Sequence, residues 1–167
     1  MAKPFEGFTQ RSTERLISVS SIGFFLILIG MIFALTPDFF SSLLTFFKDL
    51  GLVQVPNVFT GIVLPAPRNP ADHTTVYSVA SWFSFVWGIF LVALLLVRIL
   101  ANSPLNKKTQ NASDIFYWLA NGFLIGRFLN GTTNTVMWFS YWSAVIMLLG
   151  VSLIIRAIIL AVIHVMR

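Results

Sequence analysis

The sequence predicts an all-α polytopic membrane protein with four transmembrane helices and one amphipathic helix at the outer membrane surface. Four apolar stretches lead to this prediction, at about residues 16–35, 77–100, 115–129 and 136–163. Three of them reach the roughly 20 residues that a helix needs to cross a bilayer, and residues 115–129 form a shorter stretch. The composition agrees, because 57% of the residues are hydrophobic and 10% are charged, against about 25% charged in soluble domains. We expect one membrane domain over residues 1–167.

The distribution of Lys and Arg predicts that both termini lie inside the cell. With the N-terminus inside, eight cationic side chains lie near inner span ends and three lie near outer ends, which is the bias that the positive-inside rule describes. The outer three are Lys48, Arg68 and Arg127. Tyr and Trp residues open the second and fourth spans, where the outer interface favours aromatic side chains. The prediction is a multi-pass protein of the cell membrane with its N- and C-termini inside.

The loop between the first two spans begins with a helix signal. Thr36 is a suitable cap, Pro37 suits the first helical position and Asp38 suits the positive end of the helix dipole. Apolar residues then recur at helical spacing, so we expect an amphipathic helix over about residues 37–50. It either lies in the outer interface or packs on the bundle as a lid. Three prolines within residues 64–70 predict an extended connection after it.

The third span carries polar and small residues that need a partner. It follows a polar stretch, residues 102–112, which predicts a short inner turn. Asn121 and Arg127 are costly against lipid, at about 2.5–3.5 kcal/mol for Arg near the bilayer centre. Gly122 and Gly126 allow another helix to approach closely. This face is either a helix–helix contact or a binding or conduction site, and the helix contact is the simpler explanation.

The fourth span continues apolar beyond Arg156, its expected inner boundary. Residues 136–155 alone supply roughly 30 Å of helix, so the following turns would leave the bilayer if the helix were perpendicular to it. Tilting absorbs only part of this excess length. We therefore expect Ile158, Ile159 and Val162 to form a contact surface, either within this bundle or with another subunit.

The sequence has no strong signature of catalysis or of a bound cofactor. It contains no cysteine, and no Lys, Asp or Glu falls in the middle of a span. Asp72 and His73 are the candidate metal ligands, as a half-site shared with another subunit, although a loop turn or a cap explains the pair more simply. The net charge of +5 is spread over the span ends without a basic stripe, so nucleic-acid binding is not expected. We expect no cofactor and no enzymatic activity from the chain alone.

Several short motifs from residue 55 onward resemble those of known proteins. They are Val55-Pro56-Asn57, Leu64-Pro65-Ala66-Pro67, His73, Val76-Tyr77-Ser78, Trp87-Gly88, Arg98, Trp138-Phe139 and Gly150-Val151-Ser152-Leu153-Ile154-Ile155-Arg156-Ala157. Over residues 55–161 the chain resembles a family of small archaeal membrane proteins with no assigned activity. The layout of four spans and an outer amphipathic helix is also similar to DoxX/DoxD-type proteins, which are associated with quinone-linked sulfur oxidation.

Three functional hypotheses follow from these observations. The first is a non-catalytic accessory or structural subunit of a larger membrane complex, such as an archaeal respiratory or monooxygenase assembly. The second is a small transporter or channel that oligomerises around the third span. The third is an oxidoreductase subunit that contacts quinone through the outer aromatic residues. In each case the expected partners are the lipid bilayer and either other membrane subunits or further copies of the chain.

Overall fold

Five α-helices and one small β-hairpin make up the structure, a computed structural model that describes residues 6–56 and 61–165. The elements follow one another as α1 (Glu6–Leu35), α2 (Phe39–Asp49), β1 (Leu50–Gln54), β2 (Val63–Pro67), the 3-10 helix η1 (Pro70–His73), α3 (Thr74–Leu100), α4 (Leu105–Phe128) and α5 (Thr135–Val165). Within the described residues, three segments are long and apolar enough to cross a membrane, namely Glu14–Leu35, Pro70–Leu100 and Thr135–Val162. The chain is therefore mostly helical and suited to a membrane.

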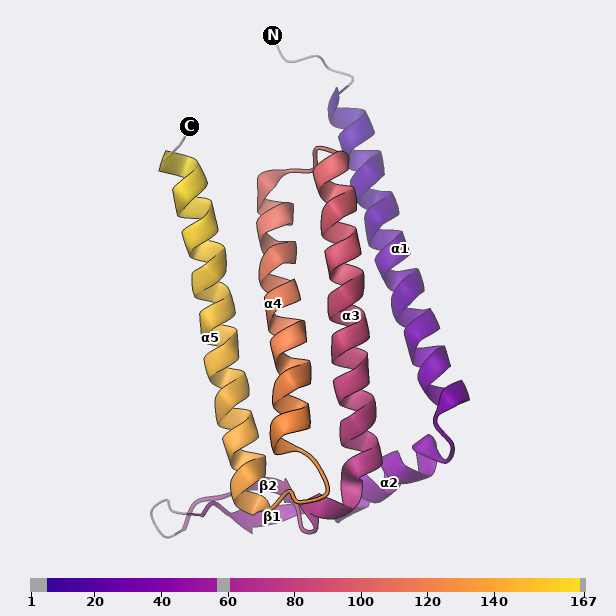
Figure 1. Ribbon diagram of the computed structural model, residues 1–167, viewed down its shortest axis with the longest axis vertical. Helices are drawn as coiled ribbons and strands as arrows, with labels where there is room; N and C mark the ends of the chain where they lie inside the picture. The colour runs from indigo at the N-terminus through magenta and orange to yellow at the C-terminus, as the bar shows by residue number, and fades with distance from the viewer. Residues whose placement is uncertain (1–5, 57–60, 166–167) are drawn as a thin grey trace.

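The four long helices stand side by side in one row, in the order α1, α3, α4 and α5 (Figure 1). The contact between α3 and α4 is the most extensive, the contact between α4 and α5 comes next, and α1 touches α3 only lightly. α2 and the β-hairpin lie across one end of the row, which we call the hairpin end. The opposite end, where residues 101–104 connect α3 to α4, is called the turn end.

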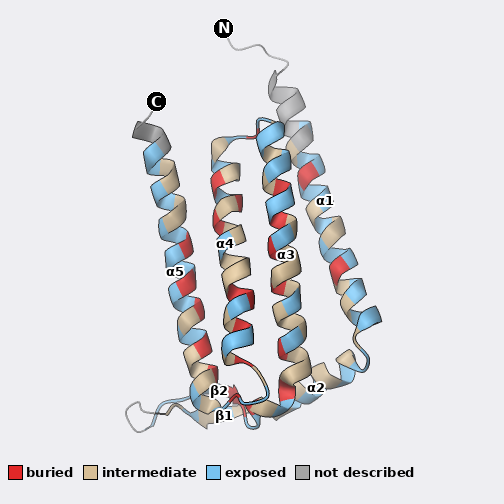
Figure 2. Cartoon of the chain, viewed as in Figure 1, coloured by how far each residue is buried: buried red, intermediate tan, exposed pale blue. Residues whose placement is uncertain are grey.

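Buried side chains concentrate where α3, α4 and α5 face one another (Figure 2). One apolar cluster lies toward the hairpin end and contains Ala66, Tyr77, Ile125, Leu129, Trp138, Tyr141 and Val145. A second cluster joins Ile17 of α1 to Leu91 and Leu94 of α3. Most of the other apolar side chains of α1 are exposed, which is the pattern expected of a helix that lipid or a partner covers.

α4 differs from the predicted third span in length and in composition. It begins at Leu105, not at residue 115, so the predicted inner turn over residues 102–112 is wrong for most of its length. The polar residues of that stretch form the first turns of a helix, and several of them are buried against neighbouring helices. This polar content also keeps α4 out of the set of segments that are apolar enough to span.

The β-hairpin corrects the all-α prediction. β1 and β2 pair antiparallel, with Leu52 opposite Pro65 and Leu50 opposite Pro67. The Arg68 amide donates to the Asp49 carbonyl at 3.1 Å, and since bonded pairs alternate along an antiparallel ladder, both prolines occupy non-bonded positions. Proline lacks an amide hydrogen, and at these positions the ladder does not require one. Residues 63–67 of the proline-rich segment are extended, as predicted, and they are also paired, whereas Pro70 begins the 3-10 helix η1.

The amphipathic helix is present as α2, slightly shorter than predicted. Asp38 takes a left-handed conformation, with φ of 53°, so the chain turns there and the helix begins at Phe39, not at Pro37. Its Phe46 side chain packs inward on the hairpin-end cluster, whereas Phe40 and Phe47 are exposed at 61% and 59%. Two large apolar side chains are thus left facing away from the protein.

Candidate functional site

A buried polar chain links α3, α4 and α5 in the half of these helices that is nearer the hairpin end. Asn121 of α4 donates from Nδ2 to Ser84 Oγ of α3 at 3.3 Å, and Tyr141 of α5 donates its hydroxyl to Asn121 Oδ1 at 3.1 Å. Ser84 in turn donates to the Ala80 carbonyl at 2.8 Å. All three side chains are buried. Asn121 is therefore the central member of a connection that runs across three helices.

Two glycines let α3 and α4 approach closely beside this chain. A Cβ atom at Gly88 would lie 2.5 Å from Leu119 Cδ2, and one at Gly122 would lie 3.1 Å from Phe85 Cδ2. The Ser81 hydroxyl donates to the Gly122 carbonyl at 3.0 Å. Small residues and interhelical hydrogen bonds are the usual means by which helices associate in a membrane.

A second set of polar contacts lies toward the turn end. Asn111 Nδ2 donates to the Leu91 carbonyl at 2.8 Å, and Ser113 donates to the Ser152 carbonyl at 2.7 Å. Arg98 donates to the Lys107 carbonyl at 3.1 Å, and Arg156 donates to Asn106 Oδ1 at 3.1 Å. Polar groups in the first half of α4 thus form hydrogen bonds with both α3 and α5.

At the hairpin end, His73 and Asp49 form a pair between segments that are far apart in the sequence. His73 Nε2 lies 2.9 Å from Asp49 Oδ2, and the His73 side chain is 4% exposed. The Asn69 amide donates to the same carboxylate oxygen at 2.8 Å. The ring of Phe46 meets the His73 ring edge-on, with centroids 5.2 Å apart. These contacts connect the end of α2 to η1, which leads directly into α3.

The environment of Asp49 favours its charged form. Partial burial acts to raise the pKa of the carboxyl, but the hydrogen bonds from His73 and from the Asn69 backbone outweigh it, so the pKa is lowered below its ordinary value. Hydrogen bonds to the charged form of an acid stabilise that form. Asp49 therefore remains an acceptor for His73 over the physiological pH range.

The candidate metal ligands Asp72 and His73 differ in their surroundings. His73 contacts Asp49, whereas Asp72 is exposed. Among the described residues, no group of three or more His, Cys, Asp or Glu side chains is placed to hold a metal ion. His164 belongs to the last turns of α5, at the opposite end of the row from His73, and its side chain lies outside the described part of the chain.

The residues predicted to form a contact surface have different positions. Asn121 and Gly122 are buried against α3 within this chain, whereas Arg127 is exposed. Ile158 and Val162 are exposed at 55% and 49%, and Ile159 is half-buried. Gly126 is exposed, and a Cβ atom there would meet only Ser81 Oγ, at 4.0 Å. A contact of these residues with another subunit stays a prediction.

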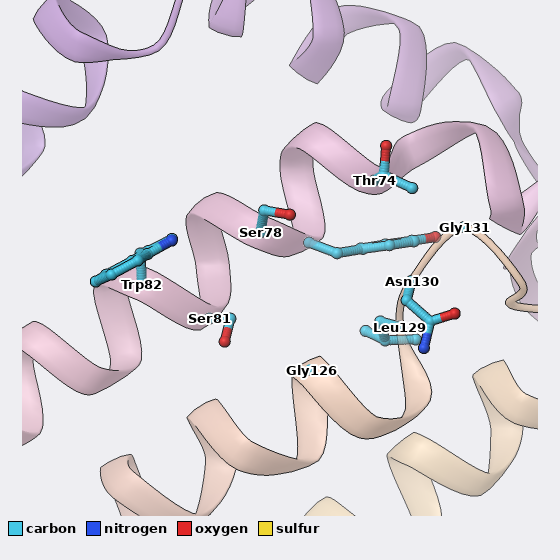
Figure 3. A pocket seen from close by; sticks show the side chains of 9 residues that line it. Thr74, Ser78, Ser81, Trp82, Gly126, Leu129, Asn130 and Gly131 are labelled. Carbon is cyan, nitrogen blue, oxygen red and sulfur yellow. The ribbon is translucent and has the colours of Figure 1, made fainter.

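Two pockets flank α3 toward the hairpin end. The first, of about 280 Å³, lies between α3 and the end of α4, and its lining includes Ser78, Ser81 and Trp82 of α3 and Gly126 and Asn130 (Figure 3). The second, of about 310 Å³, lies between α1 and α3 and has an almost entirely apolar lining. Trp82 is the one residue that lines both pockets.

Sequence reasoning missed Asp49, Ser84 and Tyr141 as partners in these sites. Asp49 lies 24 residues from His73, and the signal was only that an acid and a histidine occur in one loop. Ser84 is one of three serines in the predicted second span, together with Ser78 and Ser81, and the sequence does not show which of them forms a buried hydrogen bond. Tyr141 was assigned to the aromatic belt of the interface, but its hydroxyl is bonded inside the row.

Comparison with known proteins gives no relative for this chain. No family model matches the sequence, no curated protein matches it, and no solved structure matches the fold. The resemblance to small archaeal membrane proteins and to DoxX/DoxD-type proteins therefore stays a prediction. The proposals below rest on the geometry of the described residues alone.

Proposed function

We propose that α1, α3, α4 and α5 each cross the cell membrane, with both termini inside and the hairpin end outside. α4 has 24 residues, or roughly 36 Å of helix, and it runs beside α3 along its length. Its buried polar side chains bond to α3 and α5, which satisfies the requirement that polar groups in a bilayer find partners within the protein. Low hydropathy in α4 is thus compatible with a fourth crossing.

Within this topology, we propose that the chain is a non-catalytic subunit of a larger membrane complex, such as a respiratory or monooxygenase assembly. The observation that carries this proposal is the single row of helices. A row has two broad faces and no interior beyond the contacts between neighbours, and α1 is held only lightly. A chain of this shape is suited to lie against other membrane helices.

The far end of α5 supports a protein partner more specifically. Apolar exposure alone is a weak argument, because lipid covers apolar helices as well as protein does. Ile158 and Val162, however, follow Arg156, which bonds to Asn106 at the start of α4. Toward the turn end α5 leans away from α4 (Figure 1), and its exposed apolar residues there reach the level where the inner headgroups are expected.

The alternative is a small oligomeric transporter or channel. The described helices stand in one row, so a path through the membrane would have to form between copies of the chain. Asn121 is the polar residue of α4 that could line such a path, but its side chain is hydrogen-bonded to Ser84 and Tyr141. This arrangement favours the subunit proposal over conduction through the third span.

Purification of the tagged chain from its native membrane in a mild detergent tests the proposal. We expect other membrane proteins to co-purify in a fixed ratio, and replacement of Ile158 and Val162 by Ala to reduce that ratio. In the matched control, Ile146 and Met147, which are exposed in the middle of α5, are replaced by Ala. This control variant should leave the ratio unchanged. A monomer without partners would contradict the subunit proposal, and a homo-oligomer with a central pore would favour the alternative.

A further inference from the structure

We propose that the chain binds one uncharged membrane amphiphile at α3, with the polar head in the pocket between α3 and α4 and the hydrocarbon chain in the pocket between α1 and α3. This site is independent of any partner subunit. Its two halves differ in chemistry in the way that the two ends of an amphiphile differ.

The first pocket offers hydrogen-bond donors without charge. The side chains of Ser78 and Trp82 and the Nδ2 group of Asn130 have no hydrogen-bond partner in residues 6–56 and 61–165. The Asn130 side chain uses only its Oδ1 atom, as an acceptor from Thr132. Tyr77 also lines this pocket, and its buried hydroxyl has no partner among the described residues. None of the lining residues is charged. Such a lining favours a head group with neutral oxygen acceptors over a phosphate or a carboxylate.

The second pocket is suited to a hydrocarbon chain. It is bounded by Leu28, Met31 and Ile32 of α1 and by Val79, Phe83 and Val86 of α3. Each pocket is close to the lower end of the roughly 300–1,000 Å³ range of small-molecule sites. The two pockets together therefore accommodate a small head and part of one chain.

The helical geometry of α3 places the two pockets on adjacent faces of this helix, on either side of Trp82. Ser78 and Trp82 are four residues apart and so lie on one face of the helix. Val79, Phe83 and Val86 lie on the adjacent face, which turns toward α1. Trp82 stands between them and is 70% exposed, so an amphiphile that crosses this side chain fills both pockets. An indole is suited to this position, because it combines an apolar ring with one donor.

Photolabelling of the full-length chain in phosphatidylcholine nanodiscs tests the proposal. The probe is a monoacylglycerol with a diazirine in its acyl chain, and the comparison probe is the fatty acid with the same labelled chain. We expect the monoacylglycerol to label residues of the α1–α3 pocket roughly tenfold more than the fatty acid, which corresponds to about 1.4 kcal/mol. Equal labelling by both probes, or labelling spread evenly over the apolar helices, would overturn the proposal.

Two variants that fill the pocket between α3 and α4, where the polar head is proposed to bind, give a second test. Gly126→Leu places a side chain where a Cβ atom meets little, and Ser78→Phe enlarges an exposed residue of the lining. Both should reduce monoacylglycerol labelling several-fold. The matched control is Gly150→Leu on α5, where a Cβ atom meets nothing within 4 Å, and it should label like the natural chain. If Gly126→Leu does not fold, Ser78→Phe decides, and unchanged labelling of a folded variant contradicts the site.

Discussion

The carboxylate of Asp49 and the imidazole of His73 meet at 2.9 Å, and this contact joins α2 to α3 although 24 residues separate the two side chains. Asp49 also accepts a hydrogen bond from the Asn69 amide at 2.8 Å. One carboxylate therefore holds three segments together, namely the end of α2, the connection after β2 and the start of α3. The position of the β-hairpin under the row depends on this connection, because β1 begins at the next residue.

Replacement of Asp49 by Ala is expected to destabilise the hairpin end. Hydrogen bonds to charged groups contribute about 1.5–3 kcal/mol, and the buried His73 ring would be left without its partner. We expect the unfolding free energy to fall by about 2 kcal/mol, measured by thermal unfolding in detergent. Asp72→Ala is the matched control, because Asp72 is an exposed acid one residue from His73. An equal fall in the unfolding free energy of both variants would show that loss of the Asp49–His73 contact does not cause the destabilisation.

The lowered pKa of Asp49 predicts a dependence on acid pH. A carboxyl with a folded pKa below its unfolded value contributes stability above the unfolded pKa, about 3.9 for Asp, and loses it as the pH falls through the folded pKa. The stability difference between the natural chain and Asp49→Ala should therefore shrink as the pH falls below about pH 4, relative to its value at about pH 5. Thermal unfolding at several pH values in this range measures this. A difference that grows between about pH 5 and pH 3 would contradict the assignment.

We expect a side chain at Gly88 to destabilise the contact between α3 and α4 unless a neighbouring side chain is made smaller. Its Cβ atom would lie 2.5 Å from Leu119 Cδ2 and 2.8 Å from Leu119 Cγ, so Gly88→Ala should cost about 1–3 kcal/mol through overpacking. Gly88→Ala combined with Leu119→Ala should recover part of this loss, because the second change removes the clashing atoms. The control Gly150→Ala, where a Cβ atom meets nothing within 4 Å, should be neutral. A neutral Gly88→Ala would show that α3 and α4 are less closely packed than described.

Loss of Asn121 should weaken the association of α4 with both of its neighbours. Asn121→Leu removes the bonds to Ser84 and Tyr141, and interhelical hydrogen bonds in membranes contribute about 0.6–2 kcal/mol. Tyr141→Phe removes only one of the two bonds, so its loss of stability should be smaller. A double-mutant cycle over these two residues should give a coupling energy above zero. Additive effects would mean that the two side chains do not interact.

The apolar helices could be predicted from the sequence because their exposed faces are apolar throughout. In α1 the apolar residues continue on nearly every side, and composition alone identifies such a segment. The start of α4 could not be predicted in this way. Asn111 and Ser113 are buried polar residues that bond to backbone carbonyls of other helices, and in a sequence they look the same as the polar residues of a turn.

The β-hairpin and the Asp49–His73 pair depend on contacts that local sequence does not specify. β1 and β2 have five residues each, too short for a clear alternation of apolar and polar positions, and the prolines in β2 argue against a strand unless the register is known. The contact surface was predicted in part from composition. Gly122 and Asn121 were expected to face another helix, and the helix that they face is α3 of the same chain.

The proposed fourth crossing gives a prediction that separates two topologies. The natural chain has no cysteine, so a single introduced cysteine reports its own side of the membrane. Suitable exposed positions are Gln54 in β1, Lys107 near the turn end and Thr132 after α4. Reaction with a membrane-impermeant maleimide in intact cells measures which of them face outward.

If α4 crosses the membrane, Gln54→Cys and Thr132→Cys should react from outside and Lys107→Cys should react only after the membrane is opened. If α4 does not cross, Lys107 and Thr132 must react from the same side, because α4 is the helix between them. The structure favours the first result, since Thr132 belongs to the hairpin end and Lys107 to the turn end of the same row. Equal access of Lys107 and Thr132 would limit the chain to three crossings and would leave α4 at the membrane surface.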